Sequence, residues 1–131
     1  LYNDPETSKL TWIPWDNNES LQSGKRSGAH NLNFSNLDST TWPLISKIYH
    51  DEVYKSTYDQ YLLNVISGAF EPNAIQGKYD AYSALIGPYA TTELQGLSFL
   101  SSSNQFYQAV ETLKDHADSR LDAVEAYIGQ Q

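Results

Sequence analysis

Apolar residues recur at spacings of three and four over most of the chain after Thr40, which is the pattern of amphipathic helices. The first helix is expected to begin near Thr41, with Thr40 or Thr41 as its cap and Pro43 in its first turn. A second helix is expected from about Glu52 to Ala69, capped by Asp51. Gly68 and Pro72 mark its end, because both residues disfavour a continuing helix.

Two more helices follow in the same pattern. The third is expected from about Asn73 to Tyr89, with Gly87-Pro88 weakening or kinking its last turn. After a connector at 96–102, the fourth is expected to start at a serine cap, Ser102 or Ser103, and to run to about Ile128. Its outer face is charged, which suits one side turned to solvent.

The apolar stripes of these helices predict the core of a helical bundle. The stripe of the fourth helix is the most regular and consists of Phe106, Val110, Leu113, Ala117, Leu121, Val124 and Ile128. The stripes of the first three consist of Leu44, Ile45, Ile48 and Tyr49, then Tyr54, Tyr58, Tyr61, Leu62, Val65 and Ala69, then Ile75, Tyr79, Tyr82, Leu85, Ile86 and Tyr89.

The first fifteen residues have a different pattern, which predicts a β-hairpin. Leu1 to Asn3 and Lys9 to Pro14 are extended in character, and the turn between them contains Asp4 and Pro5. A lone hairpin is marginal in water. Because the first strand has no lead-in residues, we expect the chain to be cut from a larger domain that contains a sheet.

Residues 16–40 show no apolar period and are expected to form a long polar loop. The fold class predicted from these patterns is mainly α, with an N-terminal β-hairpin and a long polar loop before about four helices. The domain prediction is a single domain over 1–131, with the hairpin at 1–15, the loop at 16–40 and the helical part at 41–131.

Composition narrows the classes of function. The chain has 131 residues and a net charge of −8, which argues against non-specific nucleic-acid binding and against docking on anionic lipid. It has no cysteine, so disulfides, thiolate metal sites and cysteine nucleophiles are excluded. No apolar run approaches the roughly 20 residues that a bilayer span needs. The absence of methionine indicates a processed or excised chain.

The segment Leu10–Ser20, LTWIPWDNNES, holds the strongest candidate for chemistry. A carboxylate at the end of a strand that carries two tryptophans can present a metal ligand, and Asp16, Asn18 and Ser20 match the opening of a calcium loop. The match then fails, because Leu21 replaces the required glycine and Ser27 the bidentate glutamate. Two alternatives stay open: Asp16 binds magnesium together with phosphate oxygens, or Asp16 and Asn18 bond the local backbone of a turn.

Other polar and aromatic groups give weaker signals. Lys25 and Arg26 between two glycines lack the spacing of a P-loop and are better explained as an exposed basic turn. The histidines follow no metal-ligand spacing, and His50 and His116 are expected to be exposed on helices. The ten tyrosines are interpreted as the edge of the core, with a sugar-binding platform as the alternative.

The order of these segments resembles the C-terminal portion of the spore-coat protein H (CotH) family kinases. The resemblance is carried by LYNDPETSKL, TWIPWDNNES, WPLISKIYHDEVYKSTYDQYL, AIQGKYDAYSALIGPYA and FYQAVETLKDHADSRLDAVEAYI, and it covers most of the chain. The I-P-W-D step is its most specific part. It implies the C-terminal subdomain of an atypical protein-kinase-like fold.

The resemblance also implies a cofactor site. The aspartate after the tryptophan is a magnesium ligand at the ATP site of the family, and here only Asp16 matches it. The family often has a second acidic residue two positions on, where this chain has Asn18, a neutral ligand. Mg²⁺ and ATP are thus implied for the full-length protein. The phosphate-anchoring lysine, the glycine-rich strands and the catalytic aspartate would precede Leu1, so the isolated chain is expected to be inactive.

Two functions are compatible with this resemblance. The first is transfer of the ATP γ-phosphate to a serine of a partner protein. The second is a non-catalytic interaction or adhesion module of a spore coat or cell surface, suggested by Asn18 and by the many tyrosines. Both imply a protein or surface partner, and the spore coat or the cell surface as location.

Overall fold

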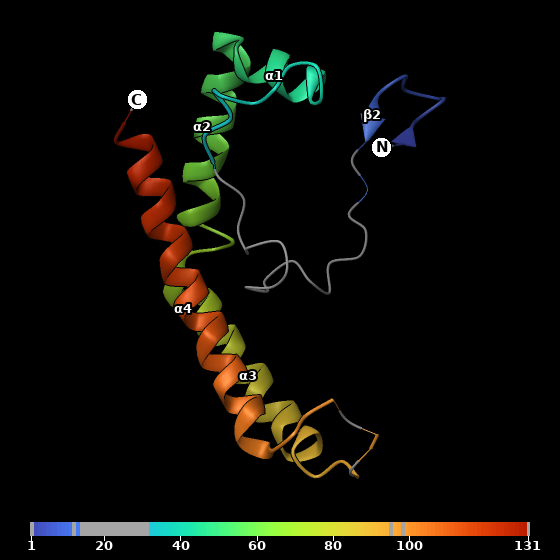
Figure 1. Ribbon diagram of the computed structural model, residues 1–131, viewed down its shortest axis with the longest axis vertical. Helices are drawn as coiled ribbons and strands as arrows, with labels where there is room; N and C mark the ends of the chain where they lie inside the picture. The colour runs from blue at the N-terminus through green and yellow to red at the C-terminus, as the bar shows by residue number, and fades with distance from the viewer. Residues whose placement is uncertain (1, 12, 14–31, 95, 98, 131) are drawn as a thin grey trace. The chain divides into compact units, whose positions relative to one another are not determined.

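The computed structural model describes residues 2–11, 13, 32–94, 96–97 and 99–130 (Figure 1). The chain divides into two compact units, Leu1–His30 and Asn31–Gln131. The described part contains a two-stranded hairpin in the first unit and four helices in the second, so the predicted mainly helical fold class with an N-terminal hairpin is confirmed. The kinase-like nature of the fold and the extent of the domain stay predictions.

The hairpin is short and antiparallel. Strand β1 (Tyr2–Asn3) pairs with β2 (Leu10–Thr11), with Tyr2 opposite Thr11 and Asn3 opposite Leu10. Asp4 organises the turn, as expected: its carboxylate accepts hydrogen bonds from the Glu6 N–H at 2.9 Å and from the Thr7 hydroxyl at 2.7 Å. These bonds stabilise the charged form and lower the pKa of Asp4, with the Thr7 hydroxyl as the main cause.

Helix α1 (Pro43–Tyr49) begins with its proline in the first turn, as predicted. The predicted threonine cap is wrong. The N-cap residue is Trp42, which makes no capping bond through its side chain. The hydroxyls of Thr40 and Thr41 donate instead to the carboxylate of Asp38, and mainly the bond from Thr41 lowers the pKa of Asp38 to about 2. An acceptor only two or three residues away satisfies these hydroxyls before the helix begins.

Helices α2 (Glu52–Ile66) and α3 (Pro72–Ala90) both start at carboxylate caps. As predicted, Asp51 caps α2, accepting from the Val53 and Tyr54 N–H groups at 3.0 and 3.2 Å. Glu71 does the same for α3, and its bonds to the Ala74 and Asn73 N–H groups lower its pKa.

The ends of these two helices differ from the prediction. Helix α2 stops at Ile66 rather than Ala69. In the turn that follows, the Phe70 N–H donates a hydrogen bond to the Val65 carbonyl at 2.8 Å. Helix α3 continues through Pro88 to Ala90. The hydroxyls of Thr91 and Thr92 donate to the carbonyls of Gly87 and Pro88, both at 2.7 Å, which satisfies acceptors at the end of the helix.

Helix α4 (Ser103–Ile128) is the longest helix of the described part, and its bounds agree with the prediction. Ser102 is the N-cap residue, but its side chain makes no capping bond. Helices α3 and α4 lie side by side, and α4 also contacts α2 (Figure 1). The predicted stripe of α4 faces these contacts: Ala117 and Val124 are buried, and its other members are half-buried.

The predicted stripes of the other helices are only partly buried. On α1, Tyr49 is buried but Leu44, Ile45 and Ile48 are exposed. Of the stripes predicted for α2 and α3, the large residues that stay exposed are Tyr54, Tyr61, Val65, Tyr82, Leu85, Ile86 and Tyr89. Among the described helices, none combines the length and the apolar character needed to span a membrane.

Candidate functional site

The predicted metal ligands Asp16 and Asn18, and the basic pair Lys25 and Arg26, lie outside the described residues. Their roles therefore stay predictions. Within the part of the chain that the structure describes, no three carboxylate, histidine or cysteine side chains gather into a group that could hold a metal ion.

The most connected polar group of the described part joins three helices. The last residue of α1 supplies Tyr49, the first half of α2 supplies Lys55 and Asp59, and the end of α4 supplies Tyr127. We call these four residues the Tyr–Asp–Lys cluster. Both tyrosines are buried, with 7% of Tyr49 and 5% of Tyr127 exposed.

Hydrogen bonds run through the cluster in a chain. The two tyrosine hydroxyl oxygens lie 3.0 Å apart, and the Tyr127 hydroxyl donates to Oδ1 of Asp59 at 2.8 Å. Oδ2 of Asp59 accepts from Lys55 Nζ at 2.9 Å. Because the single proton of Tyr127 goes to Asp59, only Tyr49 can donate between the two phenols. Oδ1 of Asn33, 3.3 Å from the Tyr49 hydroxyl oxygen, is a second and more distant acceptor for the same proton.

The ammonium group of Lys55 also lies over the two rings. Its Nζ is 5.8 Å from the ring centre of Tyr49 and 5.7 Å from that of Tyr127, within the range of a cation–π contact. The cation is therefore compensated by a carboxylate on one side and by two aromatic faces on the other.

The cluster changes the acidity of Tyr127. Burial is the largest cause that raises the pKa of Tyr127 far above its ordinary value, and the hydrogen bonds with Tyr49 and Asp59 add to it. Burial also raises the pKa of neighbouring Tyr58. Tyr127 and Tyr58 therefore stay protonated at neutral pH and serve as hydrogen-bond donors rather than as nucleophiles.

Aromatic packing connects the cluster to residues that precede α1. Phe34 lies edge-on to Tyr49, with ring centres 5.7 Å apart, and 5.8 Å from Tyr58. The Tyr58 hydroxyl donates to the Leu32 carbonyl at 3.1 Å. The residues around Phe34 therefore pack against α1 and α2.

An open depression of about 360 Å³ lies beside the cluster on α2. Its lining consists of five polar residues and two apolar ones, Glu52, Lys55, Ser56, Asp59, Gln60, Leu63 and Ile128. Both charges that reach it from the cluster are already paired with each other. The arrangement therefore supports a structural role, in which the cluster holds α2 against α1 and α4.

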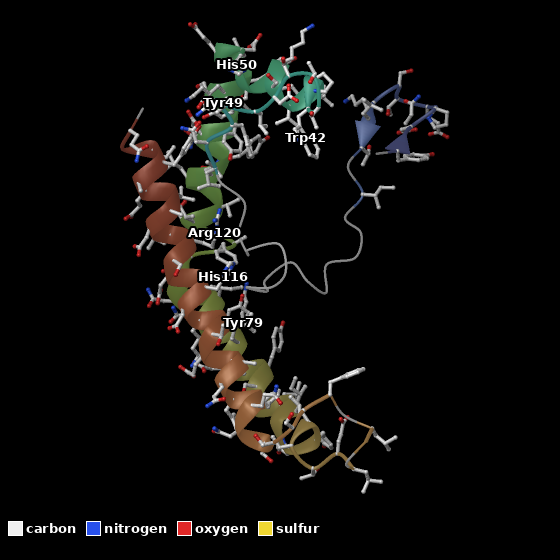
Figure 2. All side chains as sticks on the ribbon, in the orientation of Figure 1. Trp42, Tyr49, His50, Tyr79, His116 and Arg120 are labelled. Atoms are coloured by element: carbon white, nitrogen blue, oxygen red, sulfur yellow. The ribbon has the colours of Figure 1, made fainter. Side chains whose placement is uncertain are left out.

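His50 and His116, both predicted to be exposed, differ in their burial. His50 is exposed, as expected, and Nδ1 of its ring lies 2.7 Å from the Ser46 carbonyl. The prediction for His116 is wrong, since it is half-buried and its ring lies edge-on to Phe70 with centres 6.4 Å apart. Burial, followed by the charge of Arg120, lowers the pKa of His116. Figure 2 shows His116 and Arg120 one turn apart on α4.

Sequence reasoning missed the Tyr–Asp–Lys cluster. Lys55 and Asp59 are four residues apart on one helix, which is a recognisable local signal for an ion pair. Tyr127 is 68 residues from Asp59, and no local pattern connects the two.

One comparison with known proteins gave a match. The family model described as CotH kinase protein matches residues 1–124 of the 131-residue chain. The match includes the hairpin, the segment with Asp16 and Asn18, and all but the last turn of α4. Comparisons with curated proteins and with solved structures gave no match.

Proposed function

Because the chain belongs to the CotH kinase protein family, we propose that it forms part of a kinase-like domain that transfers the γ-phosphate of ATP to a serine of a partner protein. The observation that carries this proposal is the family match over residues 1–124, which covers the I-P-W-D step. By the same resemblance, the proposed location is the spore coat or the cell surface.

Asp16 is the residue proposed to hold Mg²⁺, with Asn18 as a second ligand. Carboxylate and amide oxygens are hard ligands of the kind that Mg²⁺ accepts, usually one or two of them beside phosphate oxygens. A bound Mg²⁺ supplies charge neutralisation of the nucleotide phosphates during phosphoryl transfer. The neutral amide of Asn18 contributes less to this than a second carboxylate, so Asp16 carries most of the proposed affinity.

The helices take a supporting role in this proposal. The Tyr–Asp–Lys cluster fixes α2 relative to α1 and α4 through buried hydrogen bonds. Rigid elements of this kind are what a phosphoryl-transfer site needs, because its catalysis depends on positioning and charge more than on covalent chemistry.

A metal titration tests the role of Asp16. Trp12 and Trp15 lie four and one residues before Asp16, so their fluorescence is the readout, with exposed Trp42 as background. Mn²⁺ or Mg²⁺ is added to the full chain with and without ATP. We expect a saturable change that is lost in Asp16→Ala and retained in Asp115→Ala, a control carboxylate on the exposed side of α4. Equal titration curves for wild type and Asp16→Ala would remove the metal role.

A non-catalytic interaction module is the second candidate function. The exposed tyrosines of α2 and α3, Tyr54, Tyr61, Tyr82 and Tyr89, favour it, since aromatic side chains are enriched in protein interfaces. It predicts binding to a protein or glycan that ATP and Mg²⁺ do not change. Incorporation of phosphate from ATP into a serine-rich peptide would exclude it as the sole function.

A further inference from the structure

Helix α3 uses one side to pack against α4. Gln76 donates to Oδ1 of Asp118 at 2.8 Å, and Asp80 forms an ion pair with Lys114. At Gly87 a Cβ atom would lie 3.3 Å from the Tyr107 hydroxyl oxygen, so the two helices approach closely there. With 3.6 residues per turn, positions 76, 80 and 87 fall on one side of the helix.

The roughly opposite side of α3 carries an apolar stripe that no described residue covers. Its members are Tyr82, Leu85, Ile86 and Tyr89, which we call the outer stripe, and each is between 49% and 76% exposed. The spacing of three, one and three residues makes them contiguous along the helix. Figure 2 shows Tyr79, just before the stripe, projecting from α3 away from α4.

We propose that the outer stripe pairs with the outer stripe of a second copy of this chain, as two antiparallel α3 helices related by a two-fold axis. The axis passes between Leu85 and Ile86. Leu85 then faces Ile86 of the other copy, and Tyr82 faces Tyr89 of the other copy. A two-fold interface must be self-complementary, and this register pairs each apolar residue of the stripe with another. The proposal does not depend on phosphoryl transfer.

Charges at the two ends of the stripe fit the same register. Lys78 lies on α3 one turn before Tyr82, and Glu93 lies beyond the end of the helix at Ala90, four residues after Tyr89; both are exposed. Neither forms an ion pair with another residue in the described ranges. In the antiparallel register Lys78 of each copy lies beside the segment that follows α3 of the other copy, where Glu93 is located, whereas a parallel pair would place like charges together. The charge pattern therefore selects a second copy in the antiparallel orientation.

The exposed area matches a weak dimer. The four side chains of the outer stripe present on the order of 500 Å² per copy, given the usual areas of tyrosine and aliphatic side chains. Two copies together would bury about 1,000 Å², near the lower limit for a specific interface. Such an area predicts reversible association at micromolar concentrations rather than an obligate dimer.

Sedimentation equilibrium of the full chain tests the proposal over about 5 to 500 µM. We expect the weight-average mass to rise towards that of a dimer. Leu85→Glu, which places two carboxylates beside the axis, is expected to keep the chain monomeric with unchanged helix content by circular dichroism. Val53→Glu is the matched control, because Val53 is 73% exposed on α2 and lies outside the stripe. It should dimerise like wild type.

A charge exchange tests the register. Lys78→Glu and Glu93→Lys are each expected to weaken the dimer at least threefold, and the double variant to restore it. A chain that stays monomeric at the highest concentration would overturn the proposal. That result is expected if another protein, or another part of the parent protein, covers the stripe. Dimerisation that survives Leu85→Glu, or a double variant without restored association, would also overturn it.

Discussion

Tyr127 connects three helices through one hydroxyl group. It lies 3.0 Å from the hydroxyl of Tyr49 on α1 and donates at 2.8 Å to Asp59 on α2, while its backbone belongs to α4. A buried phenol with these partners keeps its proton to higher pH in the folded than in the unfolded chain. At the residue scale, Tyr127 therefore links the packing of the helices to pH.

The first prediction concerns this link. The pKa of Tyr127 is raised above its ordinary value of 10.0, so its contribution to stability is complete below about pH 10 and is lost as pH rises towards the folded pKa. We expect the free energy of unfolding to fall between pH 9.5 and 11 more steeply for wild type than for Tyr127→Phe. The slopes should differ by up to about 1.4 kcal/mol per pH unit. Urea denaturation followed by circular dichroism measures both.

Tyr61→Phe is the control for this experiment, because Tyr61 is exposed on α2 and should leave the pH slope of wild type unchanged. At lower pH, Tyr127→Phe is expected to be less stable than wild type by about 1–3 kcal/mol, since Asp59 and Tyr49 lose a buried partner. Parallel pH profiles for wild type and Tyr127→Phe would contradict the assignment.

Helix α3 shows at the element scale how one sequence pattern can be assigned to the wrong face. The regular stripe from Ile75 to Tyr89 predicts the core side, yet Tyr82, Leu85, Ile86 and Tyr89 are exposed. The contact with α4 is made instead by polar groups at Gln76 and Asp80 and by the close approach at Gly87. Apolar periodicity states that a face prefers burial, but it does not state which partner covers it.

Two glycines of α3 give the second prediction. Gly77→Ala should raise the free energy of unfolding by roughly 0.5–1 kcal/mol, because alanine favours the helix and nothing lies within 4 Å of the added Cβ. At Gly87 the added Cβ would lie 3.3 Å from the Tyr107 hydroxyl oxygen and 3.4 Å from Cε1 of Phe106. We expect Gly87→Ala to gain less or to destabilise, as measured by urea midpoints.

Each of these glycine variants controls for the other, since both change the same residue type in the same helix. Equal stabilisation by the two substitutions would mean that the α4 side chains opposite Gly87 move aside at little cost in free energy. It would then contradict the close α3–α4 packing.

The charge of the whole molecule sets its response to salt. The chain has 16 acidic and 8 basic side chains, so the folded state carries a net repulsion that salt screens. The ion pairs of Lys55 and Lys114 are few and partly exposed, and exposed pairs contribute little.

The third prediction follows from this imbalance. The urea midpoint should rise when NaCl is increased from about 10 to 300 mM, over which the screening length falls several-fold. Asp122→Asn, on the exposed side of α4, should be more stable than wild type at low salt and respond less to added salt. A midpoint that falls with salt would show that attractive pairs dominate. Protein concentrations well below the micromolar range keep the proposed dimer out of the comparison.

The sequence by itself determined the local elements. The cap at Asp51, the start of α4 after Ser102, the proline of α1 and the turn at Asp4 lie where local patterns predict them, because a helix start or a tight turn depends on residues within one turn of each other. The I-P-W-D step likewise pointed to the CotH family, which the match over residues 1–124 confirms. The roles of Asp16 and Asn18 remain predictions from that resemblance.

Only the tertiary structure decided which groups meet. It places Tyr127 beside Asp59, 68 residues away in the chain, and packs His116 against Phe70. It also turns the outer stripe of α3 away from α4. The physical reason is that a local pattern records the preference of each residue for burial or exposure. The partner of a buried group depends on how whole helices pack, and that packing is set by the shapes and charges of residues far apart in the chain.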